Sequence, residues 1–478
     1  MRALLLLWLC CVGLLLGDSA HALPMYAQRS GRTCANCHES PTYEDPDGWE
    51  DPALAWRKCS LSCGACHVDP SGGGLRNAAG VYYGQSTLPA LPTQERGYGD
   101  LDRELLGRER VQRWLQRVDT PARAQGDRHI PSSWQEVQEG LGQGQVGNLA
   151  AVGRPLTGPS RMALWDGRYD DLNADPLLRV GGDLRGAWWS GNGRVFPMQA
   201  DLHAGLHPVE HLSVVGTLAA RGRSSGAEAV VRSSRSPVFL RRAFLMLHEL
   251  PFYSWVKAGA FMPAFGTYID DHTAFSREYV ELDPARSDSV VHGVEVGASP
   301  NYPVVTVSAF RTGMFDPEHP DGDGWGAAAT AGWRDLAWSL VGSGMVKRRA
   351  ARGGRDLEAA ALSWGFNPFA LYDAVPLTYM GEVVLGRGDG PVVGTRTPFS
   401  AWRHELWWTV ANGLVARFEL DLGDAELGGP STTWRRLGLG LDLVLVPGLT
   451  LDAHARHLAA PGDDPDVADV IVQTHLWF

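Results

Sequence analysis

The stretch "RLGLGLDLVLV" at residues 436–446 alternates apolar residues with small or polar ones. Successive side chains on a β-strand point to opposite faces, so a strand through this stretch has one leucine face and one polar face. The leucine face holds Leu437, Leu439, Leu441, Leu443 and Leu445, and the other holds Arg436, Gly438, Gly440 and Asp442. This alternation over about ten residues matches a tilted strand that crosses a lipid bilayer.

Other stretches repeat the pattern. In "LLRVGGDLRGAWW" at 177–189 one face carries Leu178, Val180, Gly182, Leu184, Gly186 and Trp188, and the other carries Arg179, Gly181, Asp183, Arg185 and Ala187. Further on, Phe196, Met198, Ala200, Leu202 and Leu206 oppose Gln199, Asp201, His203 and His207. Near the carboxyl end, Leu414, Ala416, Phe418, Leu420 and Leu422 oppose Arg417, Glu419 and Asp421. Each of these stretches therefore predicts a strand with one apolar face.

Runs of this kind begin near residues 177, 195, 211, 238, 255, 290, 303, 325, 336, 356, 379, 401, 412, 433, 448 and 469, about sixteen in all. Some connections are tight, such as "ANG" at 411–413 and "VPG" at 446–448, whereas those at 222–236, 265–289 and 387–400 are long. Short turns at one rim and long loops at the other are typical of outer-membrane barrels. We predict a mainly β fold, a transmembrane antiparallel β-barrel of about sixteen strands over residues 176–478, wide enough to enclose an aqueous lumen.

A soluble β-sandwich or propeller is the alternative, but it has no need of aromatic residues at the rims of many long strands. Such residues stand here at Trp188, Trp189, Trp402, Trp407, Trp408, Trp434, Trp477 and Phe478. The last run, "VIVQTHLWF" at 470–478, ends the sequence on an aromatic residue. A strand-final aromatic residue resembles the signal that bacterial outer-membrane proteins present for barrel assembly. Both features favour the membrane barrel.

The first 22 residues predict export. They contain one basic residue, an apolar run over 4–16 and the small-x-small sequence "AHA" at 20–22. This is the pattern of a secretory signal peptide, and its apolar run is too short to span a bilayer. We therefore expect an exported protein with a signal peptide over residues 1–22.

The mature sequence spells Cys-x-x-Cys-His twice, as "CANCH" at 34–38 and "CGACH" at 63–67. A c-type haem is held by two thiols that add across its vinyl groups and by an imidazole that ligates iron, and this motif supplies all three. A thioredoxin-like dithiol, a zinc site and a pair of disulfides are alternatives. The sequence thus predicts two covalent haems c; the attachment residues are Cys34, Cys37 and His38 for one and Cys63, Cys66 and His67 for the other, with His38 and His67 as axial iron ligands.

These motifs lie in a short segment rich in Gly, Pro and Ser, which we predict to be a dihaem cytochrome c segment over residues 23–85, folded around its haems with short helices. Met25 and His129 are candidate distal ligands. Residues 86–175 are predicted to be a connector or plug with short helices, among them an amphipathic helix over 101–118.

Two loops carry clustered polar residues. "FMPAFGTYIDDHTAFSRE" at 261–278 could line a constriction or bind a metal, and an ordinary extracellular or inward-folded loop is the alternative. "DPEHPDGDGW" at 316–325 offers oxygen ligands for a metal, although acidic residues are also common in turns that bind no metal, because they favour the turn conformation itself. The formal net charge of −11 argues against nucleic acid as a partner.

The whole layout resembles the outer-membrane cytochrome–porin fusions of iron-oxidising bacteria: a signal peptide, "CANCH", a connector, strands and a terminal Phe478. The second motif, "CGACH", departs from their usual single motif and is similar to the cytochrome segments attached to barrels in metal-reducing bacteria. The resemblance implies electron transfer across the bacterial outer membrane, with periplasmic cytochromes, an extracellular donor or acceptor such as iron, and membrane lipid as partners. A porin with a tethered periplasmic cytochrome and a dihaem peroxidase or reductase are the alternatives; an electron-transfer protein is favoured over a turnover enzyme.

Overall fold

The computed structural model describes residues 67–76, residue 90 and most of 178–477. The gaps in the last range are 192, 210, 223–237, 253, 268–273, 284–288, 300–302, 313–323, 335–337, 349–355, 369–376, 390–395, 412, 428–432, 447 and 463–465. The predicted signal peptide, "CANCH", most of the predicted connector with its helix, the loop over 316–323 and Phe478 lie outside the described residues. No helix in the described part of the chain is long and apolar enough to cross a membrane.

Sixteen strands and one short helix make up the described fold. In chain order they are β1 (Leu178–Trp189), β2 (Arg194–Val209), β3 (Leu212–Arg221), β4 (Val238–Leu250), β5 (Ser254–Phe261), α9 (Phe275–Glu278), β6 (Val291–Ala298), β7 (Pro303–Thr312), β8 (Trp325–Arg334), β9 (Trp338–Arg348), β10 (Leu357–Phe366), β11 (Leu377–Asp389), β12 (Arg396–Ala411), β13 (Leu414–Asp424), β14 (Thr433–Val446), β15 (Leu449–Ala459) and β16 (Val467–Trp477).

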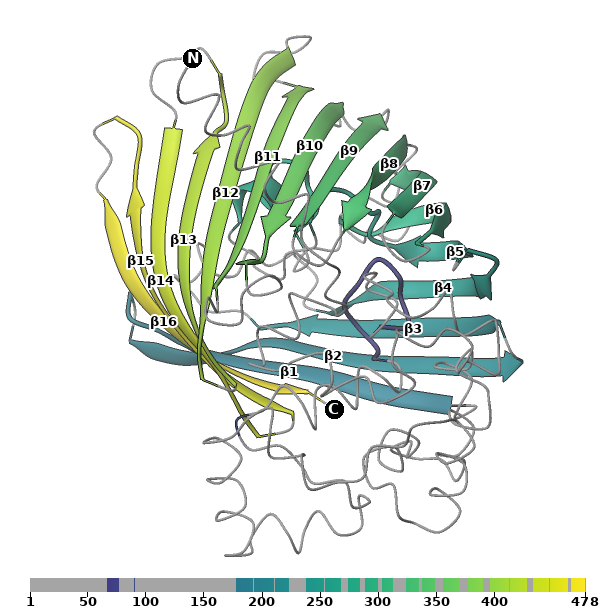
Figure 1. Ribbon diagram of the computed structural model, residues 1–478, viewed down its shortest axis with the longest axis horizontal. Coiled ribbons are helices and arrows are strands. Elements are labelled where there is room, and N and C mark those ends of the chain that lie inside the picture. Colours follow the sequence, from purple (N-terminus) through teal and green to yellow (C-terminus); the bar gives the residue numbers. More distant parts are fainter. Residues whose placement is uncertain are drawn as a thin grey trace, which may run out of the picture.

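The strands form one closed antiparallel barrel in which each strand pairs with its neighbours in sequence. The first and last strands close it, with Asp183 opposite Trp477 and Trp189 opposite Ile471. Figure 1 shows the strands following one another around the barrel wall. The predicted barrel is confirmed, and the largest error in a predicted start is at β12, which begins at Arg396 rather than near 401.

The two rims of the barrel differ in their connections. One rim, called the turn rim here, carries the tight turns at 210–211, 412–413 and 447–448, and β16 ends there. The opposite loop rim carries the long connections, such as 222–237 and 262–290. The predicted asymmetry between the rims is therefore confirmed.

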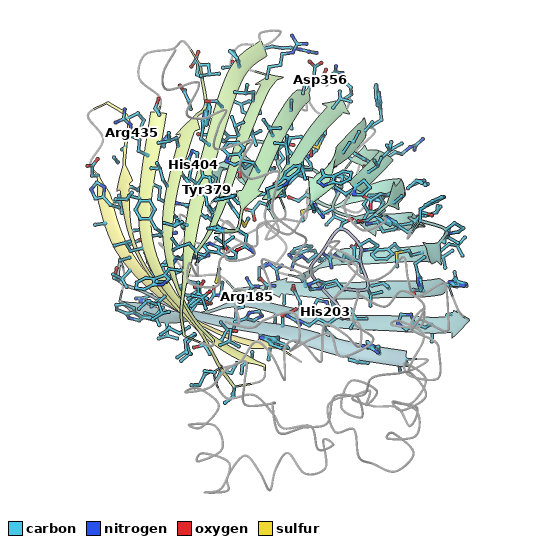
Figure 2. The ribbon with its side chains drawn as sticks, viewed as in Figure 1. Arg185, His203, Asp356, Tyr379, His404 and Arg435 are labelled. Carbon is cyan, nitrogen blue, oxygen red and sulfur yellow. The ribbon has the colours of Figure 1, made fainter. Side chains whose placement is uncertain are left out.

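The barrel wall is apolar outside and charged inside. On β14 the outward side chain of Leu439 is 61% exposed, whereas on the neighbouring β13 the inward carboxylate of Asp421 is 1% exposed. The side-chain view shows Arg185 and His203 among the residues of β1 and β2, and Asp356 at the loop rim (Figure 2). An apolar outer band around a polar interior is the arrangement of a lipid-embedded barrel.

Two predicted faces are wrong at the start of β2. Phe196 and Met198 are buried inside with Ala187 and Trp189 rather than facing outward. The cause is a β-bulge, because Arg185 pairs with Gln199 and the next residue, Gly186, pairs with Pro197. The extra residue reverses the alternation, and the predicted faces hold again beyond the bulge.

The rim tryptophans also divide between the two faces. Trp188, Trp402 and Trp408 are exposed on the outside, as a membrane-interface belt requires. Trp189 and Trp477 are instead buried, and the indole N–H of Trp189 donates to Asp469 at 2.9 Å. Aromatic residues near a strand end therefore serve both the lipid interface and the lumen.

A polar pair on the outer face is satisfied locally. The hydroxyl of Tyr379 on β11 and Nδ1 of His404 on β12 lie 2.7 Å apart, and their rings stack with centroids 6.1 Å apart (Figure 2). The ring of Trp364 meets His404 edge-on at 6.0 Å. The hydrogen bond between Tyr379 and His404 lowers the cost of a polar group on an apolar surface.

Candidate functional site: the barrel lumen

Residues 67–76, called the lumenal segment here, lie inside the barrel and form a tight hairpin-like turn (Figure 1, purple). An isolated bridge joins His67 to Arg76, and the amide of Val68 donates to the carbonyl of Leu75 at 3.0 Å. Three consecutive glycines, 72–74, turn the chain at positive φ, where a side chain would be strained. The segment begins at the histidine of the second Cys-x-x-Cys-His motif.

A fully buried lysine on β5 anchors this segment. Nζ of Lys257 lies 3.0 Å from Oδ1 of Asp69, 2.8 Å from Oε1 of Glu295 on β6 and 3.1 Å from Oγ of Ser71. The hydroxyl of Ser71 also donates to Glu295 at 2.9 Å. Lysine is rarely buried unless paired, and here one ammonium joins a carboxylate of the segment to one of the wall.

Arginine side chains of the barrel wall donate hydrogen bonds to backbone carbonyls of the lumenal segment. Arg242 on β4 donates to the carbonyls of Gly72 and Gly73, both at 2.6 Å, and its Nε lies 3.5 Å from the carboxylate of Asp69. Arg179 on β1 donates to the carbonyl of Arg76 at 3.2 Å. The charged wall thus satisfies backbone carbonyls that would otherwise be buried without partners.

The last residue of the segment also binds the wall. The guanidinium of Arg76 lies over the ring of Trp477, 4.2 Å from its centroid, and 3.7 Å from the carboxylate of Asp183. A guanidinium this close to an indole face makes a cation–π contact. Because Trp477 lies at the end of β16, this contact fixes the segment near the turn rim.

Burial and neighbouring charges fix the protonation of two segment residues. Desolvation, with help from the Arg76 and Arg242 guanidiniums, lowers the pKa of His67 to about 3, so its imidazole is neutral. Burial alone would raise the pKa of Asp69, but Lys257 and Arg242 hold it below its usual value. Nδ1 of His67 is enclosed and has no hydrogen-bond partner in the described part of the chain. A neutral, enclosed imidazole fits the role of an iron ligand.

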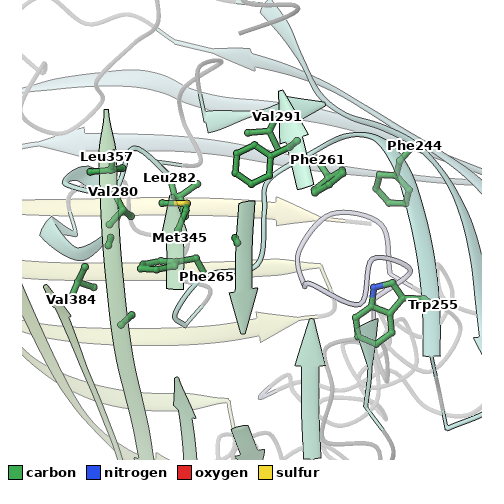
Figure 3. Packing of buried hydrophobic residues seen from close by; sticks show 14 of the residues in the cluster. Phe244, Trp255, Phe261, Phe265, Val280, Leu282, Val291, Met345, Leu357 and Val384 are labelled. Atoms are coloured by element: carbon green, nitrogen blue, oxygen red, sulfur yellow. The ribbon is translucent and has the colours of Figure 1, made fainter. Parts of the chain in front are cut away.

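The connection between β5 and β6, residues 262–290, is a second lumenal insert. It folds inward, and the side chains of Phe265, Val280 and Leu282 join the apolar cluster of the inner wall (Figure 3). Figure 3 also shows Met345 of β9 and Val384 of β11 within this cluster. The described residues of this loop therefore fold inward, and its predicted role in lining a constriction or binding a metal stays a prediction.

Buried charges also hold this insert. Arg277 of α9 donates to Glu382 on β11 at 3.2 Å and to the carbonyl of Phe265 at 2.7 Å. Lys347 on β9, fully buried like Lys257, donates to the carbonyls of residues 280 and 281 at 3.1 and 3.0 Å. Asp270, Asp271 and His272 of the predicted metal-binding stretch lie outside the described residues.

The wall formed by β12–β16 is lined with alternating charges. Arg403 pairs with Glu405, Glu419 and Asp421, and Arg436 also pairs with Asp421. Further around the barrel, Arg417 and His454 approach Asp442, and Arg456 binds Asp469. Buried charges of both signs in mutual contact avoid the cost of an unpaired buried ion. This wall therefore presents a polar, charged surface to the lumen.

Of the predicted haem-site residues, only His67 is among those described. Cys34, Cys37, His38, Cys63, Cys66, Met25 and His129 lie outside the described residues, so haem attachment and distal ligation there stay predictions. In the described part of the chain, no group of three or more His, Cys, Asp or Glu is arranged to hold a bare metal ion. Lys257 and Arg242, which anchor the segment, were not singled out from the sequence. Each is a basic residue on the inward face of a strand with alternating apolar and polar side chains, and that position was the available signal.

No protein-family model matches the chain, and no curated protein matches it. Among solved structures, the chain is similar to OprB of Pseudomonas putida at 11% identity and a TM-score of 0.49, over 66% of this chain and 97% of that one. It is also similar to a loop-deletion mutant of the outer membrane protein OmpT of Vibrio cholerae (13%, TM-score 0.46, 63% and 99%) and to the anion-selective porin from Comamonas acidovorans (11%, TM-score 0.42, 63% and 99%). The strand pairing and the division of side chains between the two faces of the wall make the described part of this chain a sixteen-stranded closed barrel.

Proposed function

We propose that the chain is an electron conduit of the bacterial outer membrane. Two c-type haems, held by the motifs at 34–38 and 63–67, relay electrons between a periplasmic carrier and an extracellular donor or acceptor. The observation that carries the proposal is the anchored position of residues 67–76 inside the lumen, since this segment begins at the histidine of the second motif. A covalent haem on that motif would be held at or within the barrel.

The barrel supplies the membrane half of the proposal. Its apolar exterior suits lipid, and its turn rim corresponds to the periplasmic side, where outer-membrane barrels have their short turns. Haems supply one-electron transfer, and the chain's own residues supply enclosure. Lys257, Arg242 and Glu295 fix the segment, while the described residues of the 262–290 insert pack against β9 and β11. Two inserts in one lumen favour passage of electrons over free diffusion of solutes.

A diffusion porin with a tethered cytochrome is the second candidate. The charged wall of β12–β16 favours it, because paired acidic and basic side chains lining a lumen suit the passage of polar solutes. In this reading the haems contact periplasmic cytochromes while the solutes use the barrel.

Haem content and transport separate these functions. The purified full-length protein should show a haem c spectrum, and Cys34→Ala and Cys63→Ala should each remove about half of it, as the two motifs require. In liposomes, the protein should reduce an enclosed electron acceptor from an external donor while passing few ions. A colourless protein, or a coloured one that conducts ions freely without moving electrons, would overturn the conduit proposal.

The peroxidase alternative has its own test. Peroxide turnover needs an open coordination position on one iron, so ferric haems that are both six-coordinate and low-spin would exclude it. Steady turnover of hydrogen peroxide by the purified dihaem protein would favour it.

A further inference from the structure

Three arginines and two carboxylates meet at the loop rim of the barrel. The carboxylate of Glu358 on β10 accepts hydrogen bonds from Nε of Arg387 on β11 at 2.6 Å and from Arg396 on β12 at 2.8 Å. It also pairs with Arg348 on β9. The carboxylate of Asp356, which Figure 2 shows at the loop rim, lies 3.3 Å from Arg396 and 3.5 Å from Arg348. These five residues are called the rim cluster here.

The rim cluster lies on the outer face of the wall. Glu358 follows Leu357, whose side chain belongs to the apolar cluster of the inner wall, so Glu358 points the opposite way. Arg387 is directly opposite Glu358 in the pairing of β10 with β11 and therefore shares its face. Arg348 follows the buried, inward Lys347 in the same way. The charges of the cluster consequently face the surroundings of the barrel and not its lumen.

The rim cluster also borders the apolar band that faces lipid. On β11 the exposed side chain of Leu385 is the outward position next to Arg387. Successive outward positions on a strand are about 7 Å apart, so the arginine lies where the hydrocarbon of the bilayer gives way to headgroups. Trp325 on β8, opposite Arg348, is 56% exposed, as expected of an aromatic residue at a membrane interface.

Positive charge exceeds negative charge in the rim cluster. Three guanidiniums contact two carboxylates, and each guanidinium has five N–H donors, more in total than two carboxylates can accept. The side chain of Arg387 is 57% exposed and that of Arg396 is 37% exposed. The connection between β9 and β10 has the sequence "RAARGGR" at 349–355, with three more arginines and no acidic residue. Exposed ion pairs stabilise a fold little, so stability alone accounts poorly for this excess.

We propose that the rim cluster binds a phosphorylated lipid headgroup of the outer leaflet. Outer-membrane barrels have their short turns on the periplasmic side, so the lipid beside the loop rim belongs to the outer leaflet. A guanidinium binds phosphate through two parallel hydrogen bonds, and clustered arginines at a membrane surface attract anionic lipids. Glu358 is a positioning residue that holds the guanidiniums of Arg348, Arg387 and Arg396 around one point.

The apolar band makes lipid the occupant rather than a free anion. The exposed leucines next to the arginines, such as Leu385, offer acyl chains a surface that inorganic phosphate would not use. A lipid bound at both its headgroup and its chains would occupy a fixed position on β9–β12. This inference goes beyond the proposed electron transfer, and it depends on the membrane position of the barrel and not on haem.

The test titrates the full-length protein in detergent with diphosphoryl lipid A and measures bound lipid by native mass spectrometry. Each arginine at a lipid surface contributes about fivefold in affinity, so Arg387→Gln combined with Arg396→Gln should weaken binding roughly twentyfold. Arg387→Lys keeps the charge but loses the planar fork, so it should weaken binding less than Arg387→Gln does. Dephosphorylated lipid A should bind the wild-type protein as weakly as diphosphoryl lipid A binds the double variant.

Arg435→Gln is the matched control. Arg435 on β14 is also exposed at the loop rim (Figure 2), but the residues opposite it on the neighbouring strands are Leu422 and Ala459. This variant loses one arginine at the same rim and should keep the wild-type affinity. Barrel folding of each variant is checked by the difference in electrophoretic mobility between heated and unheated samples.

Several outcomes would overturn the proposal. Equal affinities of the wild-type protein and the folded double variant would remove the role of the rim cluster, and an equal loss in Arg435→Gln would reduce it to general surface charge. Equal binding of lipid A with and without its phosphates would exclude headgroup recognition. Displacement of the lipid by an equimolar amount of inorganic phosphate would show a site for a free anion. None of these results bears on the conduit proposal, which is tested by haem content and electron transfer.

Discussion

The two lumenal inserts are held in different ways. The 262–290 insert connects adjacent strands and adds large apolar side chains to the inner wall, so its docking combines a short chain closure with hydrophobic burial. The segment 67–76 contributes only Val68 and Leu75 to that cluster, and its ion pair from Asp69 to Lys257 joins residues 188 positions apart. The distant insert therefore depends on charge, whereas the local insert depends on packing as well.

Removal of the Lys257 ammonium should have the largest effect on how firmly the lumenal segment is held. Lys257→Met leaves the carboxylates of Asp69 and Glu295 buried together, and loss of one partner of a buried pair costs about 3–5 kcal/mol. We expect release of the segment and a several-fold rise in ion conductance through planar bilayers. Lys347→Met is the matched control, since it removes the other fully buried lysine and should leave the segment in place. A conductance of Lys257→Met that stays at the wild-type level would contradict the contrast.

Weakening the ion pair of the local insert should have a smaller effect. Glu382→Gln removes the charge partner of Arg277 but keeps an oxygen that can accept from Ser363, which donates at 2.8 Å. We expect a loss of about 1–3 kcal/mol in the free energy of unfolding, because the apolar contacts remain. Denaturant titration of the detergent-solubilised barrel measures it. A release of the insert as complete as that of the segment in Lys257→Met would show that packing contributes little.

The turn-rim end of the segment offers a third comparison. Arg76→Gln removes the cation–π contact with Trp477 and the ion pair with Asp183, together worth about 1–2 kcal/mol. The Lys257 network should still hold the rest of the segment, so conductance should rise only slightly. A rise in conductance as large as that of Lys257→Met would show that Arg76, not Lys257, is the main anchor of the segment.

Loss of the Thr330 hydroxyl, which contacts the 262–290 insert, should have the smallest effect on stability. The hydroxyl of Thr330 on β8 donates to the carbonyl of Ala264 at 3.1 Å and lies 2.9 Å from Oγ of Ser343. Thr330→Val should cost about 0.5–1.5 kcal/mol of unfolding free energy and leave conductance unchanged. Thermal melting followed by circular dichroism measures the change, and a conductance increase would show that this single bond closes the lumen.

The barrel itself was predictable because alternation is a local signal. Runs such as 436–446 carry the two-residue period of a strand in every pair of positions, and their faces came out as predicted. The bulge that turns Phe196 and Met198 inward was not predictable, since it depends on pairing with β1. A local pattern thus predicts a strand but not the irregularities imposed by its partner.

The contacts inside the lumen could not be predicted from a sequence pattern, for a related reason. The Cys-x-x-Cys-His motif at 63–67 was evident from five residues. The placement of the lumenal segment that begins at its histidine depends on Lys257, Arg242 and Glu295, which come together only when the barrel closes. His203 and His207 were placed on the polar face of β2, but their partners, Asp183 of β1 for His203 and Ser213 of β3 for His207, lie on neighbouring strands. Long-range pairing, not composition, decides these contacts.

The scarcity of lysine in this chain has a practical consequence. The sequence holds lysine only at Lys58, Lys257 and Lys347, and the last two are fully buried. Reagents that acylate primary amines should therefore leave both unmodified in the folded barrel. Modification of Lys257, located by mass spectrometry of peptides, would therefore report dissociation of the lumenal segment from the wall. The reaction can be followed in intact cells without any spectroscopic label.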